Sequence, residues 1–253
     1  MRHIGILKPD KWIAIVNWFG VPIFLIYIFS MFVYPWFCDG AKWACVQNTW
    51  DRWQGLNVGV LAFASSIIAF SISRYNAQKQ KERDFLAAKA FLPNSLSELC
   101  DYFSACASLL EEAWRLGGED RSKLVVPELP ESYKEVFGNC IRYSESDVGD
   151  YLTNILVNLQ INHSRLKAFS DRLSASDKIN IITYVYRLGE LQALVNRLFP
   201  YARNMQKFDA GHLEWEDFRN AYSNFFTFYE DFSVDEKNNL VSLTLRKIEA
   251  SKY

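Results

Sequence analysis

The order of apolar and polar positions divides the chain near residue 73. Before it lie two uncharged runs, residues 12–37 and 54–73, which are 26 and 20 residues long. A helix rises about 1.5 Å per residue, so about 20 residues cross a hydrocarbon core of ~30 Å. The pattern predicts an N-terminal two-helix transmembrane hairpin, with a short tail at 1–11 and a connection at 38–53.

The second run carries its small residues on one helix face, which we call the small-residue seam. They recur at steps of three and four residues: Gly55, Gly59, Ala62, Ser66, Ala69 and Ser73. In lipid, helices pack closely where small residues let their backbones approach. Two alternatives follow. The seam packs against the first span of the same hairpin, or it packs against another copy of the chain.

Asn17 is the conspicuous polar residue of the first run. Inside a bilayer, its amide would join two helices through a hydrogen bond. Because Asn17 lies close to the start of the run, the alternative is a position near the headgroups, where it would bond water or a backbone carbonyl.

Basic residues set the expected orientation. Both segments that flank the hairpin are enriched in Lys and Arg, and the second contains Arg74, Lys79, Lys81 and Arg83. Such enrichment keeps a flank in the cytoplasm, so we expect both termini to be cytoplasmic and the connection to face the exterior. The same four side chains either bind anionic lipid headgroups or serve topology alone.

The spacing of the cysteines and histidines does not indicate a metal or redox site. Cys38 and Cys45 fall in the exterior connection, where an oxidising compartment allows a disulfide between them without requiring it. No C-x-x-C pair occurs and the three histidines stand far apart, so we expect no metal site.

Residues 74–253 carry an almost uninterrupted helical period. We expect one helix to run out of the membrane until Pro93 interrupts it, and a shorter helix at 132–143. Apolar stripes with steps of three and four begin at four positions: Leu92, Val148, Ile181 and Trp215. The pattern predicts an all-α fold in which the cytosolic part is an antiparallel helical bundle.

The last stripe is strongly aromatic, and we expect it to face the core: Trp215, Phe218, Tyr222, Phe225, Tyr229 and Phe232. The sequence Ser233-Val234-Asp235-Glu236 follows it with the pattern of a capping box. In that motif each end residue satisfies a backbone N–H of the other, so it predicts the start of the final helix.

Catalytic and nucleic-acid-binding signatures are both missing from the sequence. No zinc-protease, hydrolase, phosphate-loop or dinucleotide motif occurs, so we expect neither enzymatic activity nor a cofactor. Residues 74–253 carry 23 Lys and Arg against 26 Asp and Glu. Because phosphate binding needs a strongly basic face, we expect no direct nucleic-acid binding.

The hairpin followed by a helical body resembles the two-transmembrane effectors of bacterial antiphage systems, including those associated with retrons. The segment AKAFLPNSLSELCDYFSAC at 88–106 looks like a recurring part of such proteins. The resemblance implies an inner-membrane toxin silenced in a complex with a soluble partner, such as a reverse transcriptase with its RNA/DNA. The alternative is a non-toxic membrane anchor or sensor whose helical domain docks a soluble partner.

Overall fold

The computed structural model describes residue 18 and residues 20–38, 43–116, 124–171, 178–225 and 232–251. All regular structure in these ranges is helical, which confirms the all-α prediction. The chain divides into two units, Met1–Asn76 and Ala77–Tyr253.

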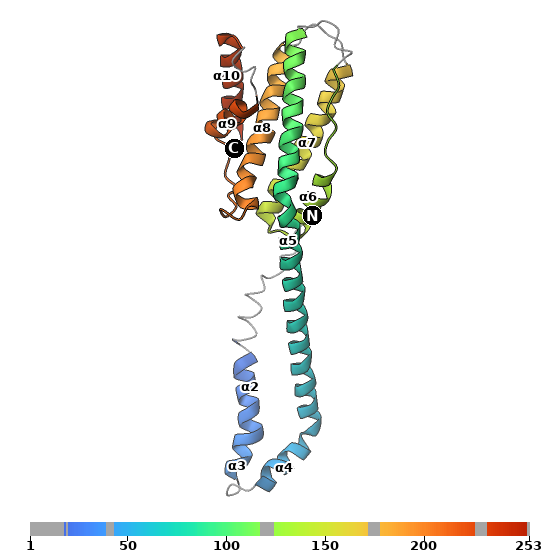
Figure 1. The fold of residues 1–253 in the computed structure, drawn as a ribbon. Helices are drawn as coiled ribbons and strands as arrows, with labels where there is room; N and C mark the ends of the chain where they lie inside the picture. The colour runs from blue at the N-terminus through green and yellow to red at the C-terminus, as the bar shows by residue number, and fades with distance from the viewer. Residues whose placement is uncertain are drawn as a thin grey trace. The chain divides into compact units, whose positions relative to one another are not determined.

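The first unit contains the apolar runs (Figure 1). Helix α2 (Val21–Ile28), the π-helical turn η2 (Phe29–Val33) and α3 (Tyr34–Cys38) follow one another without a break. Pro22 falls in the first turn of α2. Next comes α4 (Trp43–Arg52), so the segment expected to be a connection contains a helix of its own.

Within the described residues, α5 (Gln54–Leu116) alone is long and apolar enough to cross a membrane. The first run appears as a shorter apolar helical stretch, Pro22–Phe37. The expected pair of spanning helices is therefore found for its second member only. Residues 12–17, and Asn17 with them, lie outside the described part of the chain.

Pro93 does not interrupt the helix, contrary to the expectation from sequence, and α5 continues through it to Leu116. Proline inside a helix costs about 3 kcal/mol, because it removes one hydrogen bond and crowds the preceding turn. Leu92 and Leu96 on either side are fully buried. Burying each such side chain contributes roughly 1.5–3 kcal/mol, so packing on both sides outweighs the cost of the proline.

The second unit packs the C-terminal part of α5 with five further helices: α6 (Ser132–Tyr143), α7 (Ser146–Asp171), α8 (Lys178–Ala202), α9 (Trp215–Phe225) and α10 (Val234–Ala250). The bounds of α6 are those predicted from the sequence. Helix α7 packs on α6 and α8, and α8 packs on α9 and α10. A strictly antiparallel bundle order remains a prediction.

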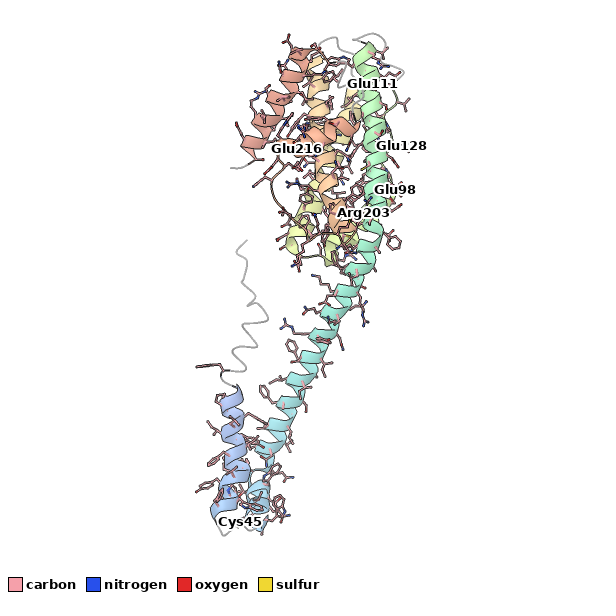
Figure 2. The ribbon with its side chains drawn as sticks, turned by 60° about the vertical axis from the view of Figure 1, so that its left-hand side comes forward. Cys45, Glu98, Glu111, Glu128, Arg203 and Glu216 are labelled. Carbon is pink, nitrogen blue, oxygen red and sulfur yellow. The ribbon has the colours of Figure 1, made fainter. Side chains whose placement is uncertain are left out.

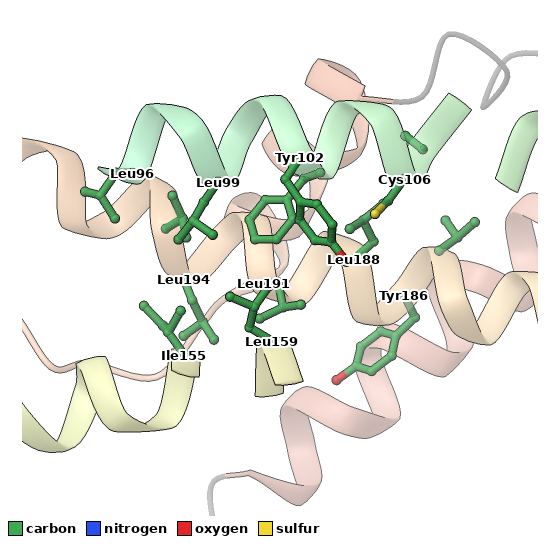
Figure 3. Close-up of a cluster of buried hydrophobic side chains, with 14 of the residues drawn as sticks. Leu96, Leu99, Tyr102, Cys106, Ile155, Leu159, Tyr186, Leu188, Leu191 and Leu194 are labelled. Atoms are coloured by element: carbon green, nitrogen blue, oxygen red, sulfur yellow. The ribbon is translucent and has the colours of Figure 1, made fainter. Parts of the chain in front are cut away.

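One hydrophobic core joins these helices (Figure 3). The stripes predicted from sequence on α5, α7 and α8 supply most of it, with side chains such as Leu99, Ile155 and Leu191 excluded from solvent. The stripes therefore face the core, as their period predicts.

Three of the four described side chains of the aromatic stripe are buried, and the fourth, Trp215, is half-buried against the core. Phe218, Tyr222 and Phe232 are each at most 4 % exposed, so these three face the core as expected. The side chain of Phe225 and the whole of Tyr229 lie outside the described part. The capping box is confirmed, because Ser233 Oγ accepts from the Glu236 N–H and Glu236 accepts from the Ser233 N–H.

Helices α8, α9 and α10 meet at the ring of Tyr222. The ring lies directly on the α8 backbone at Gly189, where an added Cβ would overlap it. The Tyr222 hydroxyl lies 2.9 Å from Thr244 Oγ1 on α10, within a buried hydrogen bond. Gly189 is therefore needed because a ring from α9 occupies the space of its side chain.

Gly189→Ala should destabilise the protein by about 1–3 kcal/mol, because the new methyl group displaces a buried ring that cannot move freely. Thermal unfolding of the full chain in lipid nanodiscs, followed by circular dichroism, measures the change. Gly138→Ala is the matched control. Gly138 lies inside α6 with nothing within 4 Å of an added Cβ, so alanine there should stabilise by about 0.5–1 kcal/mol. Equal melting of the two variants would contradict the packing role of Gly189.

Candidate functional site

A buried asparagine joins the helices of the first unit. Asn57, near the start of α5, is only 4 % exposed, although most of its neighbours on α5 are exposed. The Tyr27 hydroxyl on α2 donates to Asn57 Oδ1 at 2.7 Å, and Asn57 Nδ2 donates to the Trp50 carbonyl at 3.5 Å. An amide in an apolar environment needs such partners, since leaving it unpaired costs several kcal/mol.

Trp50 extends this contact to the π-helical turn. Its indole Nε1 donates to the Met31 carbonyl at 3.3 Å, and the Met31 side chain is buried. Met31 lies in η2, and π-turns are frequent at functional positions of helices. The four residues Tyr27, Met31, Trp50 and Asn57 form a set that we call the hairpin clamp. It connects α2, η2, α4 and α5.

The hairpin clamp and the small-residue seam occupy opposite faces of α5. Successive residues turn by about 100°, which places Val60 and Ala64 within about 60° of Asn57. Val60 and Ala64 are partly buried, on the same face as the buried Asn57. The same turn places Gly55 and Gly59 about 160° from Asn57.

The seam is open in the single chain. All six of its residues are exposed, and a Cβ added to Gly55 or Gly59 would meet nothing within 4 Å. No described residue thus covers the seam at Gly55 or Gly59, and both alternatives for its partner remain predictions. Asn57 was not singled out from the sequence. The signal was present, since it is the one asparagine within the uncharged run at 54–73.

The apolar side chains of α5 face outward. Only 6 % of its most apolar stretch is buried within the chain, whereas a core helix of a soluble protein would be mostly buried. Large exposed apolar surfaces mark sites of contact with membranes or other proteins. Length, composition and exposure together favour membrane association of this helix.

Tryptophans gather where α3 meets α4. The rings of Trp36 and Trp43 lie edge to face with centroids 6.2 Å apart, and Trp43 and Trp53 are both exposed. Such amphipathic rings are typical of membrane–water interfaces. Figure 2 labels Cys45 on α4, where it is half-buried. The Cys38 side chain lies outside the described part, so a Cys38–Cys45 disulfide remains a prediction.

The four basic residues after the apolar stretch are exposed on α5. Lys79 forms an ion pair of 2.7 Å with Glu82, and the hydrogen bond from Lys79 lowers the pKa of that carboxyl. The Arg74 guanidinium lies 5.6 Å from the centroid of the Phe70 ring. Lys81 and Arg83 are exposed in the same way, so the cluster is accessible to anionic headgroups.

Two of the three cysteines of the second unit lie in the apolar core. Cys106 and Cys140 are fully buried, and burial raises the pKa of each thiol to about 11. A nucleophilic or metal-binding cysteine is a thiolate, which burial in apolar surroundings disfavours. Across the described residues, no group of three His, Cys, Asp or Glu side chains is arranged to hold a metal.

His163 also has a structural partner. Its Nδ1 lies 3.0 Å from the Tyr102 hydroxyl, a hydrogen bond between α7 and α5. Burial, reinforced by the charge of Lys167, lowers the pKa of His163, so the ring is neutral near pH 7. The pair ties α5 and α7 together.

Comparison with known proteins identifies no relative: no family model, no curated protein and no solved structure matches this chain.

Tyr27→Phe tests the hairpin clamp. It removes the donor to Asn57 Oδ1 and should weaken the association of α2 with α5 by about 0.5–2 kcal/mol. Unfolding of the reconstituted chain with a denaturing detergent, followed by tryptophan fluorescence, reports the loss. In a double-mutant cycle with Asn57→Leu, the second change should cost less once the first is present. Fully additive losses would show that the two side chains do not interact.

Proposed function

We propose that this chain is a membrane-anchored effector of a bacterial antiphage system, a toxin that disrupts the inner membrane when released from an inhibitory complex. In this proposal, residues 12–37 and 54–73 form a two-helix hairpin across that membrane, with both termini in the cytoplasm. The cytosolic part is an antiparallel helical bundle that docks a soluble protein partner, such as a reverse transcriptase with its RNA/DNA.

The open seam is the observation that carries this proposal. The hairpin clamp uses the Asn57 face of α5, and Gly55 and Gly59 on the opposite face have empty space above them. A face of small residues is suited to close helix–helix contact in lipid. We therefore assign the clamp face to the hairpin and the seam face to a second copy of the chain.

Two faces on one helix allow two states. In the silent state the partner keeps copies apart, and the clamp alone orders each hairpin. After release, seam-to-seam contact assembles hairpins and breaches the bilayer. A partner needs to bind one state only a few kcal/mol more tightly than the other to control this balance.

Gly59→Ile tests the seam in cells. Isoleucine is favourable in a membrane helix, so the variant should insert, but its branched side chain should keep the backbones apart. Induced expression with a membrane-potential dye should show depolarisation by the parent chain and none by Gly59→Ile. Leu61→Ile is the control. Leu61 lies off the seam and is 62 % exposed, and the substitution preserves the volume of the side chain. Equal depolarisation by all three chains would exclude the seam hypothesis.

Crosslinking identifies what the seam contacts. In a Gly59→Cys variant, crosslinked dimers in depolarised cells would support self-association.

If neither the parent chain nor its variants alter the membrane potential, the alternative function of a non-toxic membrane anchor or sensor is favoured.

Topology is a separate prediction. A reporter enzyme that works only in the periplasm should stay inactive when fused after Tyr253, because the basic flanks hold both termini in the cytoplasm. A cytoplasmic reporter at the same position should be active and serves as the control for expression. Strong periplasmic activity would reverse the orientation.

A further inference from the structure

A cavity of about 200 Å³ opens in the second unit between α7, α8, α9 and α10. The segment between α8 and α9 forms one wall, with Gly211 and His212 among its lining residues. This wall is held in place by Arg197, which donates to the Gly211 carbonyl and pairs with Asp217 at 3.1 Å. The cavity is therefore formed by contacts within the chain, and we call it the Glu190 cleft.

Glu190 supplies the negative group of the cleft. Its Oε1 accepts a hydrogen bond of 3.0 Å from the Tyr186 hydroxyl, and none of the described residues forms an ion pair with it. Burial raises the pKa of Glu190, although the Tyr186 hydrogen bond and the charges of Arg187 and Lys247 oppose the shift. A partly buried carboxylate without an ion pair is stabilised when a cation binds beside it.

Aromatic rings from α7, α8 and α9 also line the Glu190 cleft. The rings of Tyr186 and Phe218 stack with centroids 5.7 Å apart and an interplanar angle of 13°. Tyr151 lines the cavity as well, with its hydroxyl donating to the Leu194 carbonyl at 3.0 Å. Tyr186 and Phe218 are both buried and stacked on each other, so they supply rigid apolar lining beside the carboxylate.

Lys247 supplies a positive charge to the cleft. Lys247 on α10 lines the cavity and its side chain is exposed, so it can reach an anionic group at the mouth. Leu194, Leu213 and Ile248 supply apolar lining to the cavity. Sites for drug-sized ligands measure about 300–1,000 Å³, so this cavity suits a smaller molecule.

We infer that the Glu190 cleft binds a small zwitterion of the α-amino acid class, with its ammonium group on Glu190 and its carboxylate on Lys247. The apolar lining favours an aliphatic side chain, of which leucine is the simplest probe. The inference does not depend on the membrane activity proposed above, because every residue of the cleft belongs to the second unit.

Calorimetric titration of the full chain in lipid nanodiscs tests the inference with three probes that share the same 3-methylbutyl group. Leucine carries both charges, isoamylamine lacks the carboxylate and isocaproate lacks the ammonium group. Leucine should bind, isoamylamine should bind more weakly, and isocaproate should not bind. Absence of leucine binding at millimolar concentration, or equal binding of leucine and isocaproate, would overturn the inference.

Two variants assign the charges. Glu190→Gln keeps the shape of the side chain and should weaken leucine binding by about tenfold or more, the typical effect of losing one charge-assisted contact. Lys247→Ala should remove the preference for leucine over isoamylamine. Circular dichroism of both variants checks that they fold. Unchanged leucine affinity in folded Glu190→Gln would contradict the assignment.

The pH dependence gives a readout that a purely structural role would not produce. Only ionised Glu190 attracts the ammonium group, so leucine affinity of the parent chain should rise as the pH increases through the raised pKa of this carboxyl. In Glu190→Gln the affinity should be flat over the same interval. A parallel rise in the variant would show that another group controls binding.

Discussion

The buried amide of Asn57 is the interaction on which the first unit depends. An apolar hairpin can rotate its helices with little change in side-chain transfer energy, because lipid is as apolar as the side chains themselves. A buried amide ends that freedom, since its donor and acceptor must find partners. Tyr27 and the Trp50 carbonyl meet this requirement at one rotation of α5. The opposite face, with Gly55 and Gly59, is left open as a consequence.

Helix α4 contributes more than a turn between two apolar segments. The Trp50 carbonyl accepts a hydrogen bond from Asn57 and its indole N–H donates to Met31, so one residue contacts both α5 and η2. Val46 on the same helix is almost fully buried. Helix α4 is thus packed within the first unit, and the exposed rings of Trp43 and Trp53 are of the kind found at membrane–water interfaces.

In the second unit, some buried polar side chains are hydrogen-bonded and others are not. Tyr222 and Tyr151 satisfy their hydroxyls across helices, but both side-chain atoms of Asn162 are buried without a hydrogen-bond partner. Such a group costs about 1–3 kcal/mol. The stripe of α7 thus includes one unfavourable polar position among its apolar residues. The proposed cleft at Glu190 is a second place where this unit keeps polar groups away from solvent, there with an opening for a ligand.

The sequence by itself determined the features that follow from local periodicity. The uncharged run at 54–73, the stripes of α5, α7 and α8, the bounds of α6 and the capping box at Ser233 all depend on residues a few positions apart, and their patterns were sufficient. The seam could be located in the same way, because steps of three and four place its residues on one face.

Only the tertiary structure decided which faces and groups meet. Tyr27 and Asn57 lie 30 residues apart, and no spacing rule connects them. The continuation of α5 through Pro93 depended on core packing that a single segment does not contain. Gly189 is required because a ring from α9 lies on it, and Glu190 faces a cavity that four helices enclose. These outcomes depend on contacts between distant segments, which periodicity along one helix does not encode.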